Sequence, residues 1–394
     1  MPSPTIVMIG QKGLPARSGG IERHVSFVAT GLAERGYRVI VYGRKWYVGT
    51  NKAPAGIEQR LTAGIHTKHL DAITHSLTAL WDARRVSPDI LHLHGTGIAL
   101  LAPLARILFP RTKLVVTFHC TDSEHAKWNA FAKAILRLGE WLACRIPDRT
   151  IVISQVLMRA CLQKYRCQSV YISHPYQLPA AIPSPELLKP FQVKENSYLL
   201  FIGRLVPNKQ IHVLLKAYAA ARKQDPARFQ SVPLLIVGGG IWTDHYVQWI
   251  HRLGANIPGV QFLGERQNEA LQALQAHALA HVFPTSSEGL SLAMLEAASY
   301  RRPIVMTNLP QNREAVGSSA IEVRSQDVED LTRGLQELLT LSPDVRAAKG
   351  EASYQHLVRS FQYIDRIDDL DRMYRELLVG DRALVSPLPA LSSS

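Results

Sequence analysis

The chain reads Pro284-Thr-Ser-Ser-Glu-Gly-Leu-Ser-Leu-Ala-Met-Leu-Glu296 directly after an apolar run that ends at Phe283. The apolar run predicts a strand, and the apolar residues of 292–298 recur at helical spacing. Gly289 and Ser291 stand between the two, where a turn and a helix start are expected. The stretch therefore predicts a strand that turns into a helix.

This turn is suited to an anionic ligand. Backbone N–H groups near Leu290 to Leu292 would point out of the helix start without partners in the chain, and such an end attracts phosphate. Glu288 and Glu296 lie on either side of these groups, with seven residues between them. We expect the two acids to make separate contacts with one extended ligand.

Two other interpretations of the acidic pair remain open. Glycoside hydrolysis needs its two carboxyl groups about 5 to 9.5 Å apart. Eight residues of helix rise about 12 Å, so Glu288 would have to fold back from the loop to reach that range. Alternatively, both acids only favour the helix dipole, although this accounts poorly for Glu296, which lies beyond the first turn.

Size and composition favour two globular domains. The chain has 394 residues, which is long for one core, with 46% hydrophobic and 20% charged residues. Four cysteines without a C-x-x-C motif or a secretory leader predict reduced thiols in a cytoplasmic protein. The longest apolar stretch, residues 97–109, contains Arg106 and is too short to span a bilayer, so any membrane contact should be peripheral.

The formal net charge of +13 lies entirely in the first half of the chain. Residues 1–180 contain 23 lysines and arginines against 10 aspartates and glutamates, whereas residues 181–394 contain 22 of each kind. This excess predicts that the first half meets something anionic: phospholipid head groups, a pyrophosphate-linked acceptor or nucleic acid. No aromatic-rich basic module of the RNA-binding type is evident, so nucleic acid is not expected.

Short strand-like runs alternate with longer segments, which is typical of an α/β fold with parallel sheets. The runs are residues 5–9, 38–42, 89–93, 113–118 and 149–153, and then 198–202, 233–237, 260–263, 281–283 and 303–306.

The proline-rich stretch 173–197 predicts the connection between two such domains. We expect domains at 1–184 and 185–355, followed by a C-terminal segment at 356–394. That segment is helical in pattern to about Leu378 and ends in a loose tail.

A glycine loop, residues 10–20, follows the first predicted strand. Gly19 and Gly20 would let the backbone approach a ligand closely, and the helix that begins there offers free N–H groups, although the loop could also be only a turn. The dinucleotide fingerprint G-x-G-x-x-G is absent here and around residues 238–240, which disfavours a nicotinamide oxidoreductase.

Two cations follow the first strand of the second domain. Arg204 and Lys209 are expected at the carboxyl edge of the sheet, where open α/β folds bind ligands. Together they suit a pyrophosphate, because arginine binds phosphate as a fork and lysine as a point charge. The alternative is two solvated surface charges.

Histidines lie at strand ends in the first half. His92 and His94 share one face of a strand, so a metal site with His119 as third ligand must be considered. No acidic or cysteine partner stands at ligand spacing, and we expect no metal; for His119 we favour a polar contact to substrate over a structural role. Asp369 and Asp371 form a D-x-D pattern, but on a helix they point apart and cannot hold one ion.

Residues 127–145 mix Lys and Arg with Trp and Leu at helical spacing. Such a helix could lie on an anionic lipid surface. The sequence slightly favours the alternative, a core-packed helix whose cations reach the solvent.

Taken together, these segments resemble the glycosyltransferase family 4 group of nucleotide-sugar transferases, with the GT-B architecture. The opening, residues 10–23, looks like the subgroup that includes bacterial rhamnosyltransferases of surface-polysaccharide assembly. The motifs that carry the resemblance, in this order, are Ser18-Gly-Gly-Ile-Glu22, His119, Gly203-Arg204, Lys209, Glu288-x7-Glu296, Pro303-Ile-Val and Asn312-Arg-Glu314.

The resemblance implies two Rossmann-like domains that face each other across a cleft, and a C-terminal helix that crosses back to the first domain. It implies retention of anomeric configuration, no required metal, and no cofactor apart from the sugar nucleotide as donor substrate.

It also implies the roles of the site residues. Glu288 would hold hydroxyls of the donor sugar and Glu296 those of the ribose, while His119 would touch the sugar near the acceptor. The remaining donor-binding residues would surround the diphosphate: Arg204, Lys209, Gly19, Gly20, Gly289, Leu290 and Ser291.

The expected function is sugar transfer to a lipid-linked or growing polysaccharide, at the inner face of the cytoplasmic membrane. Transfer to a soluble acceptor and a noncatalytic sugar-nucleotide binder are the alternatives. The chain has Ser173-His-Pro-Tyr176 where many relatives carry Pro-Asn-Gly, which affects the interdomain connection rather than the donor site.

Overall fold

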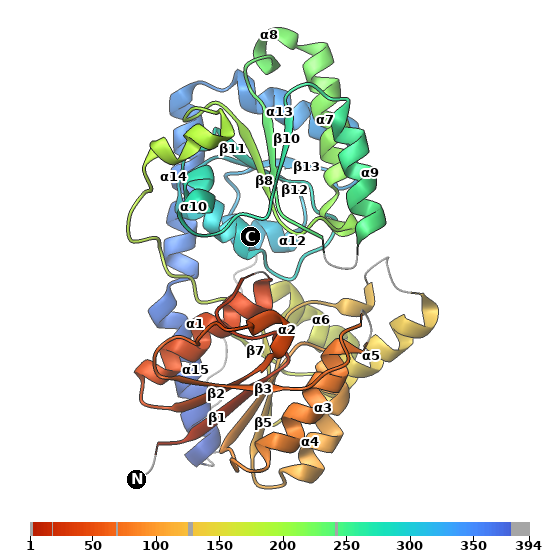
Figure 1. The fold of residues 1–394 in the computed structure, drawn as a ribbon, viewed down its shortest axis with the longest axis vertical. Coiled ribbons are helices and arrows are strands. Elements are labelled where there is room, and N and C mark those ends of the chain that lie inside the picture. The colour runs from red at the N-terminus through yellow and green to blue at the C-terminus, as the bar shows by residue number, and fades with distance from the viewer. Residues whose placement is uncertain (1–2, 18, 68–69, 125–128, 241–242, 380–394) are drawn as a thin grey trace.

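The computed structural model describes residues 3–17, 19–67, 70–124, 129–240 and 243–379. These residues form two α/β domains, one above the other in Figure 1. The predicted tail beyond residue 379 and the first residues of the predicted 127–145 helix lie outside the described residues.

The first domain contains a sheet of seven parallel strands in the order β3-β2-β1-β4-β5-β6-β7. Its strands are β1 (Thr5–Ile9), β2 (Arg38–Arg44), β3 (Ile57–Thr62), β4 (Ile90–His94), β5 (Lys113–Phe118), β6 (Arg149–Val152) and β7 (Val170–Tyr171). Its helices are α1 (Gly20–Glu34), α2 (Lys45–Val48), α3 (Asp71–Ala83), η1 (Ile98–Leu101), α4 (Ala102–Leu108), η2 (Asp122–Glu124), α5 (Ala130–Arg145) and α6 (Gln155–Tyr165).

The second domain contains a sheet of six parallel strands in the order β10-β9-β8-β11-β12-β13. Its strands are β8 (Leu199–Ile202), β9 (Leu234–Val237), β10 (Val260–Gly264), β11 (Ala280–Phe283), β12 (Ile304–Thr307) and β13 (Ile321–Val323). The helices are η3 (Pro185–Phe191), η4 (Pro207–Lys209), α7 (Ile211–Gln224), α8 (Pro226–Phe229), α9 (Asp244–Ala255), α10 (Asn268–Ala276), α11 (Leu292–Ser299), α12 (Pro310–Val316), α13 (Val328–Thr340), α14 (Pro343–Ser360) and α15 (Tyr363–Val379).

The two parallel-sheet domains confirm the predicted fold class. All ten predicted strands exist, with ends that differ by at most two residues. The sequence missed β3, β7 and β13, and each of these is an edge strand. An edge strand has one neighbour and can be short or polar, as in Ile57–Thr62, so it lacks the continuous apolar run of a central strand.

Central strands are buried on both faces, which is why they are almost wholly apolar. In β1, Ile6 and Met8 pack with α1 and α15, whereas Val7 and Ile9 pack with α3 and α4 on the opposite face. In the second domain α7 and α13 cover one face and α10 and α11 lie on the other.

Helix α15 crosses back to the first domain, where it lies beside α1 (Figure 1). Ile367, Leu370 and Tyr374 join the first domain's core. Asp371 accepts a hydrogen bond of 2.7 Å from Tyr37, so this member of the D-x-D pattern contributes to helix docking. The other member, Asp369, pairs with Arg366 and Arg372 of its own helix.

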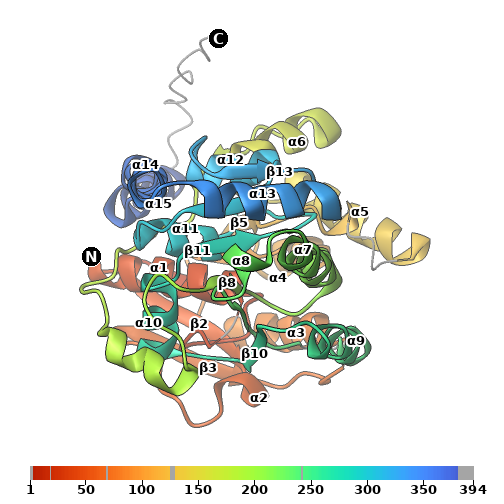
Figure 2. The same cartoon turned by 90° about the horizontal axis from the view of Figure 1, so that it is seen from above.

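Helix α5 extends away from the rest of the first domain in both views (Figures 1 and 2). Its last turns are packed, with Leu142 and Ala143 buried. Its outer side is exposed and apolar: Phe131, Ile135, Leu138 and Trp141 are 75%, 39%, 50% and 45% exposed. The core-packed interpretation therefore holds only for the end of this helix. Within the described residues, no helix has both the length and the apolar character needed to cross a bilayer.

Candidate functional site

The loop between β11 and α11 is fixed to the start of the second domain. The carbonyl oxygen of Asn208 accepts hydrogen bonds from the backbone N–H of Ser286 at 2.8 Å and from the hydroxyl of Thr285 at 3.0 Å. These contacts bring the carboxyl ends of β8 and β11 together. As a result, Lys209 and Glu288 form an ion pair, with both side chains largely buried.

Gly289 touches the first domain. A Cβ atom built on it would lie 1.9 Å from the carbonyl oxygen of His119, and no side chain fits there. Ser291 forms the start of α11, and both it and Leu290 are buried. The predicted anion-binding turn therefore lies directly against the strand end that carries His119.

Glu296 lies in α11, and its buried carboxylate pairs with Arg23 of α1. This ion pair joins the two domains. For Glu296 we predicted a ligand contact, and Arg23 was not singled out, because the two residues are far apart in the chain and lie on different domains.

The glycine loop of the first domain faces the same region. Gly19 has φ of 102°, a backbone conformation that favours glycine, and a Cβ there would displace the carboxylate of Glu22, which lies 1.9 Å from its position. The same carboxylate accepts a hydrogen bond of 3.1 Å from the backbone N–H of Lys12. Gly20 starts α1, and a Cβ on it would come within 3.9 Å of Leu292.

Positive charges from both domains converge beside this loop. Burial lowers the pKa of Lys12; Glu22 opposes this effect and Arg204 adds to it. Lys12 therefore feels the charge of Arg204 across the domain interface. Arg204 itself is exposed after β8, close in sequence to Lys209. Like charges held together in this way favour an anionic ligand between them.

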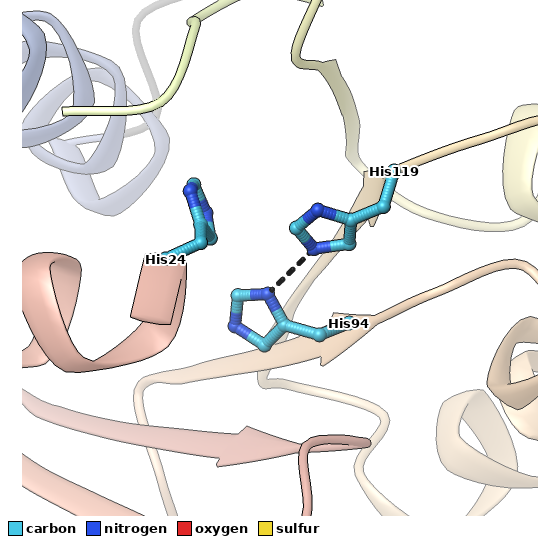
Figure 3. Close-up of side chains that lie close together, drawn as sticks. All are labelled: His24, His94 and His119. Atoms are coloured by element: carbon cyan, nitrogen blue, oxygen red, sulfur yellow. Dashed lines mark hydrogen bonds between the residues drawn. The ribbon is translucent and has the colours of Figure 1, made fainter. Parts of the chain in front are cut away.

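A cluster of buried histidines lies below the Gly289 contact. His94 Nδ1 and His119 Nε2 are 3.4 Å apart, and His24 of α1 approaches both rings (Figure 3). Nδ1 of His174 lies 2.9 Å from Nδ1 of His24. Burial lowers the pKa of all four imidazoles, for His174 to about 3, so the cluster is neutral near pH 7.

His92 does not join this group as a third metal ligand would. Its two ring nitrogens lie 2.6 Å from the Thr117 hydroxyl and 2.6 Å from the Tyr374 hydroxyl. The three residues considered from the sequence as metal ligands, His92, His94 and His119, therefore do not form one set of ligands. The ring nitrogens that lie near one another belong to His24, His94 and His119, and the sequence of α1 gave no local sign that His24 would be among them.

Comparison with known proteins identifies the family. The profile described as Glycosyltransferase Family 4 matches residues 18–175, and the profile described as Glycosyl transferases group 1 matches residues 196–341. A D-inositol 3-phosphate glycosyltransferase from Stackebrandtia nassauensis is 31% identical over 410 residues, which cover 94% of this chain and 89% of that protein. The chain therefore belongs to the glycosyltransferase family that these two profiles and this relative represent.

Two further similarities extend over almost the whole length of this chain. A GDP-mannose-dependent alpha-(1-6)-phosphatidylinositol monomannoside mannosyltransferase from Mycobacterium tuberculosis is 25% identical over 413 residues, covering 96% of this chain and 99% of that one. The structure of Anabaena HepE in complex with UDP and glucose matches with a TM-score of 0.74 at 18% identity, covering 95% of this chain and 100% of that chain. This last match concerns the fold alone, which is GT-B.

Proposed function

We propose that this glycosyltransferase moves a sugar from a nucleotide-diphosphate sugar to a lipid-linked or growing polysaccharide, with retention of configuration and without a required metal. The observation that carries the proposal is the positive charge that faces the interface from both domains. The charge of Arg204 acts on Lys12 across the interface, and Lys209, paired with Glu288, lies near Gly203 at the same strand end. A diphosphate between the domains would offset the repulsion between Lys12 and Arg204.

The donor would span the second domain's strand ends. Arg204 and Lys209 would bind the diphosphate, and Lys209 already lies beside Glu288, which would hold the sugar hydroxyls. The turn at Gly289, Leu290 and Ser291 would add backbone donors. Glu296 would hold the ribose hydroxyls while it remains paired with Arg23.

These groups favour the transition state. A departing nucleoside diphosphate gains negative charge as the glycosidic bond breaks, so cations already in position stabilise that state more than the bound donor. We assign retention to a front-face reaction in which the leaving phosphate accepts the proton of the acceptor hydroxyl, so no protein nucleophile is needed. Because His119 is buried and neutral, it would contact the sugar and would not compete with the cations for the phosphate.

The named relatives support a sugar nucleotide of this class, since one uses GDP-mannose and another structure holds UDP and glucose. The rhamnosyltransferase subgroup stays a prediction. A thermal-shift screen with UDP-, GDP- and dTDP-sugars would identify the donor, because a ligand that binds only the folded state raises the melting temperature.

Transfer assays with the identified donor test the site. Glu288→Ala and Arg204→Ala should each abolish sugar transfer while the circular dichroism spectrum stays unchanged. Arg252→Ala, an exposed arginine on α9, is the matched control and should keep full activity. Full activity in Arg204→Ala would contradict the assignment, and product NMR with an inverted anomeric proton would contradict retention.

The acceptor side of the proposal rests on α5. Four large apolar side chains lie along its exposed side, and Lys133, Arg137 and Arg145 lie on the same helix. Apolar side chains beside cations, in a domain with a +13 excess, are complementary to an anionic bilayer surface. The protein would then be peripheral at the inner face of the cytoplasmic membrane, where a lipid-linked acceptor lies.

Liposome flotation tests this part separately. The protein should float with vesicles that contain phosphatidylglycerol at low salt, and less so at high salt, since screening weakens attraction between surface charges. Vesicles of phosphatidylcholine alone provide the comparison. Protein that stays in the soluble fraction with both would favour a soluble acceptor.

A further inference from the structure

Four histidines from separate segments meet between the two domains. His24 lies in α1, His94 ends β4, His119 follows β5 and His174 lies in the connection to the second domain. None is more than 6% exposed. A neutral imidazole has one ring nitrogen whose lone pair can bind a metal ion.

The spacing of these nitrogens suits one ion. One ring nitrogen from each of His24, His94 and His119 lies within 4.8 Å of the other two (Figure 3). Nδ1 of His94 and Nε2 of His119 are 3.4 Å apart. A tetrahedral ion with bonds of about 2.0–2.1 Å to imidazole separates two such nitrogens by about 3.3–3.4 Å. As a hydrogen bond between two nitrogens the same contact is long.

His174 orients the ring of His24. Nδ1 of His174 lies 2.9 Å from Nδ1 of His24, so one of these two nitrogens donates a hydrogen bond and the other accepts it. When His24 is the donor, its lone pair is on Nε2 and can bind an ion. A hydrogen-bonded partner of this kind orients histidine ligands in metal sites.

The ring of His94 has too few partners for its burial. Its Nε2 is buried without a hydrogen-bond partner among the described residues, and its Nδ1 has only the long contact to His119. A metal bond at Nδ1 would replace this long contact with a stronger interaction. Nε2 would then carry the proton of the ring, so the metal bond does not by itself satisfy Nε2.

We propose that His24, His94 and His119 bind one divalent transition-metal ion, with His174 as a positioning residue. Three neutral imidazoles favour Zn²⁺, Co²⁺ or Ni²⁺ and leave a fourth position for water. A set without carboxylates does not suit Mg²⁺ or Ca²⁺.

The consequence for activity rests on the proposed function. When Nε2 of His119 holds a metal ion, this nitrogen is no longer free to contact the donor sugar, so the ion should inhibit transfer rather than support it. The enzyme would then have a metal-sensitive state, although we propose no metal for its chemistry.

Titration of the chelator-treated protein with Co²⁺ tests the site without any activity assay. The wild type should bind one ion per chain and give the visible absorption spectrum of four-coordinate Co²⁺, which Zn²⁺ abolishes by displacement. His24→Ala and His94→Ala should lose the spectrum. His174→Gln should bind about 10- to 100-fold more weakly.

His245→Ala is the control, because this histidine is exposed on α9, away from the cluster, and should bind as the wild type does. No saturable binding by the wild type, or an unchanged spectrum in His94→Ala, would overturn the proposal. If the alanine variants do not fold, a Zn²⁺-induced rise in melting temperature that is smaller in His174→Gln supports it, and an equal rise rejects it. Binding of a sugar nucleotide by the metal-free protein remains a separate measurement of the proposed function.

Discussion

The two domains share one fold but present different chemistry where they meet. The first domain contributes neutral, buried imidazoles from His24, His94 and His119, and the second contributes the ion pair of Lys209 and Glu288 with exposed Arg204 nearby. Their overall charge differs as well, with the whole +13 excess in residues 1–180.

This difference separates two tasks. Charged groups at the strand ends of the second domain suit the part of a donor that carries and develops negative charge. Uncharged polar rings at the strand ends of the first domain suit a sugar, which has hydroxyls but no charge. Part of the basic character of the first domain lies away from this site, as in Lys133, Arg137 and Arg145 of α5.

The sharpest test of the charged half is Lys209→Ala. We expect kcat/KM for transfer to fall about 10²- to 10³-fold, because one preplaced charge at the leaving group is lost and Glu288 is left without its partner. Steady-state kinetics with the identified donor measure this. Lys216→Ala, an exposed lysine on α7, should change nothing. Equal kcat/KM values for the two variants would show that the charge of Lys209 has no part in sugar transfer.

The contact between the two halves can be broken at Gly289. In Gly289→Ala the new methyl group meets the His119 carbonyl, so the contact between the domains must shift, at a cost of about 1 to 3 kcal/mol. We expect lower activity and a lower melting temperature. Gly97→Ala is matched, since a Cβ there meets nothing within 4 Å. A fully active Gly289→Ala protein would mean that the closed arrangement is not needed for transfer.

Membrane binding should distinguish the domains as well. Trp141→Ser on α5 should lower partition onto anionic vesicles about tenfold, since an inserted aromatic side chain contributes at least about 1.4 kcal/mol. Trp249→Ser changes a tryptophan of similar exposure, 40% against 45%, on the second domain. Sedimentation with vesicles compares them. Equal losses would show that the attachment is not confined to the first domain.

The second domain also contains a buried histidine, His281, so neutral imidazoles are not confined to the first domain. Burial lowers the pKa of His281 to about 4, so the unfolded chain binds one more proton than the folded one between pH 4 and 6.5. Stability from this group is full above pH 6.5 and is lost as the pH falls toward 4.

In His281→Leu, urea titrations at pH 5 and 6 should therefore give a pH slope smaller by about 1.4 kcal/mol per pH unit than in the wild type. Above pH 7.5 the slopes should agree. A wild-type slope retained at pH 5 to 6 would mean that His281 is protonated in the folded protein.

The sequence was sufficient wherever a signal is local. Strand–turn–helix units such as residues 283–296 are read from apolar spacing and a glycine, and parallel strands bring their carboxyl ends to one edge, so Lys209 and Glu288 could be expected together. Contacts between domains could not be read in this way. Arg23 and Glu296 meet only after both domains fold, and neither position carries a pattern that names the other.

The same reason explains the histidine cluster. His94 and His119 end adjacent strands and were expected to be close, whereas His24 comes from a helix and His174 from the connection. On α1, His24 is one more buried residue beside Val25 and Val28. Its place in the cluster depends on the direction in which α1 leaves the glycine loop. The spacing of residues along the chain does not determine this direction.

Helix α15 has a consequence for the order of biosynthesis. Since it completes the core around α1, the domain that leaves the ribosome first is the last to be finished. Until residues 363–379 emerge, Val25, Val28 and their neighbours lack part of their cover, so the nascent chain exposes an apolar face throughout synthesis of the second domain. Chaperone dependence of this protein should accordingly reside in its amino-terminal half.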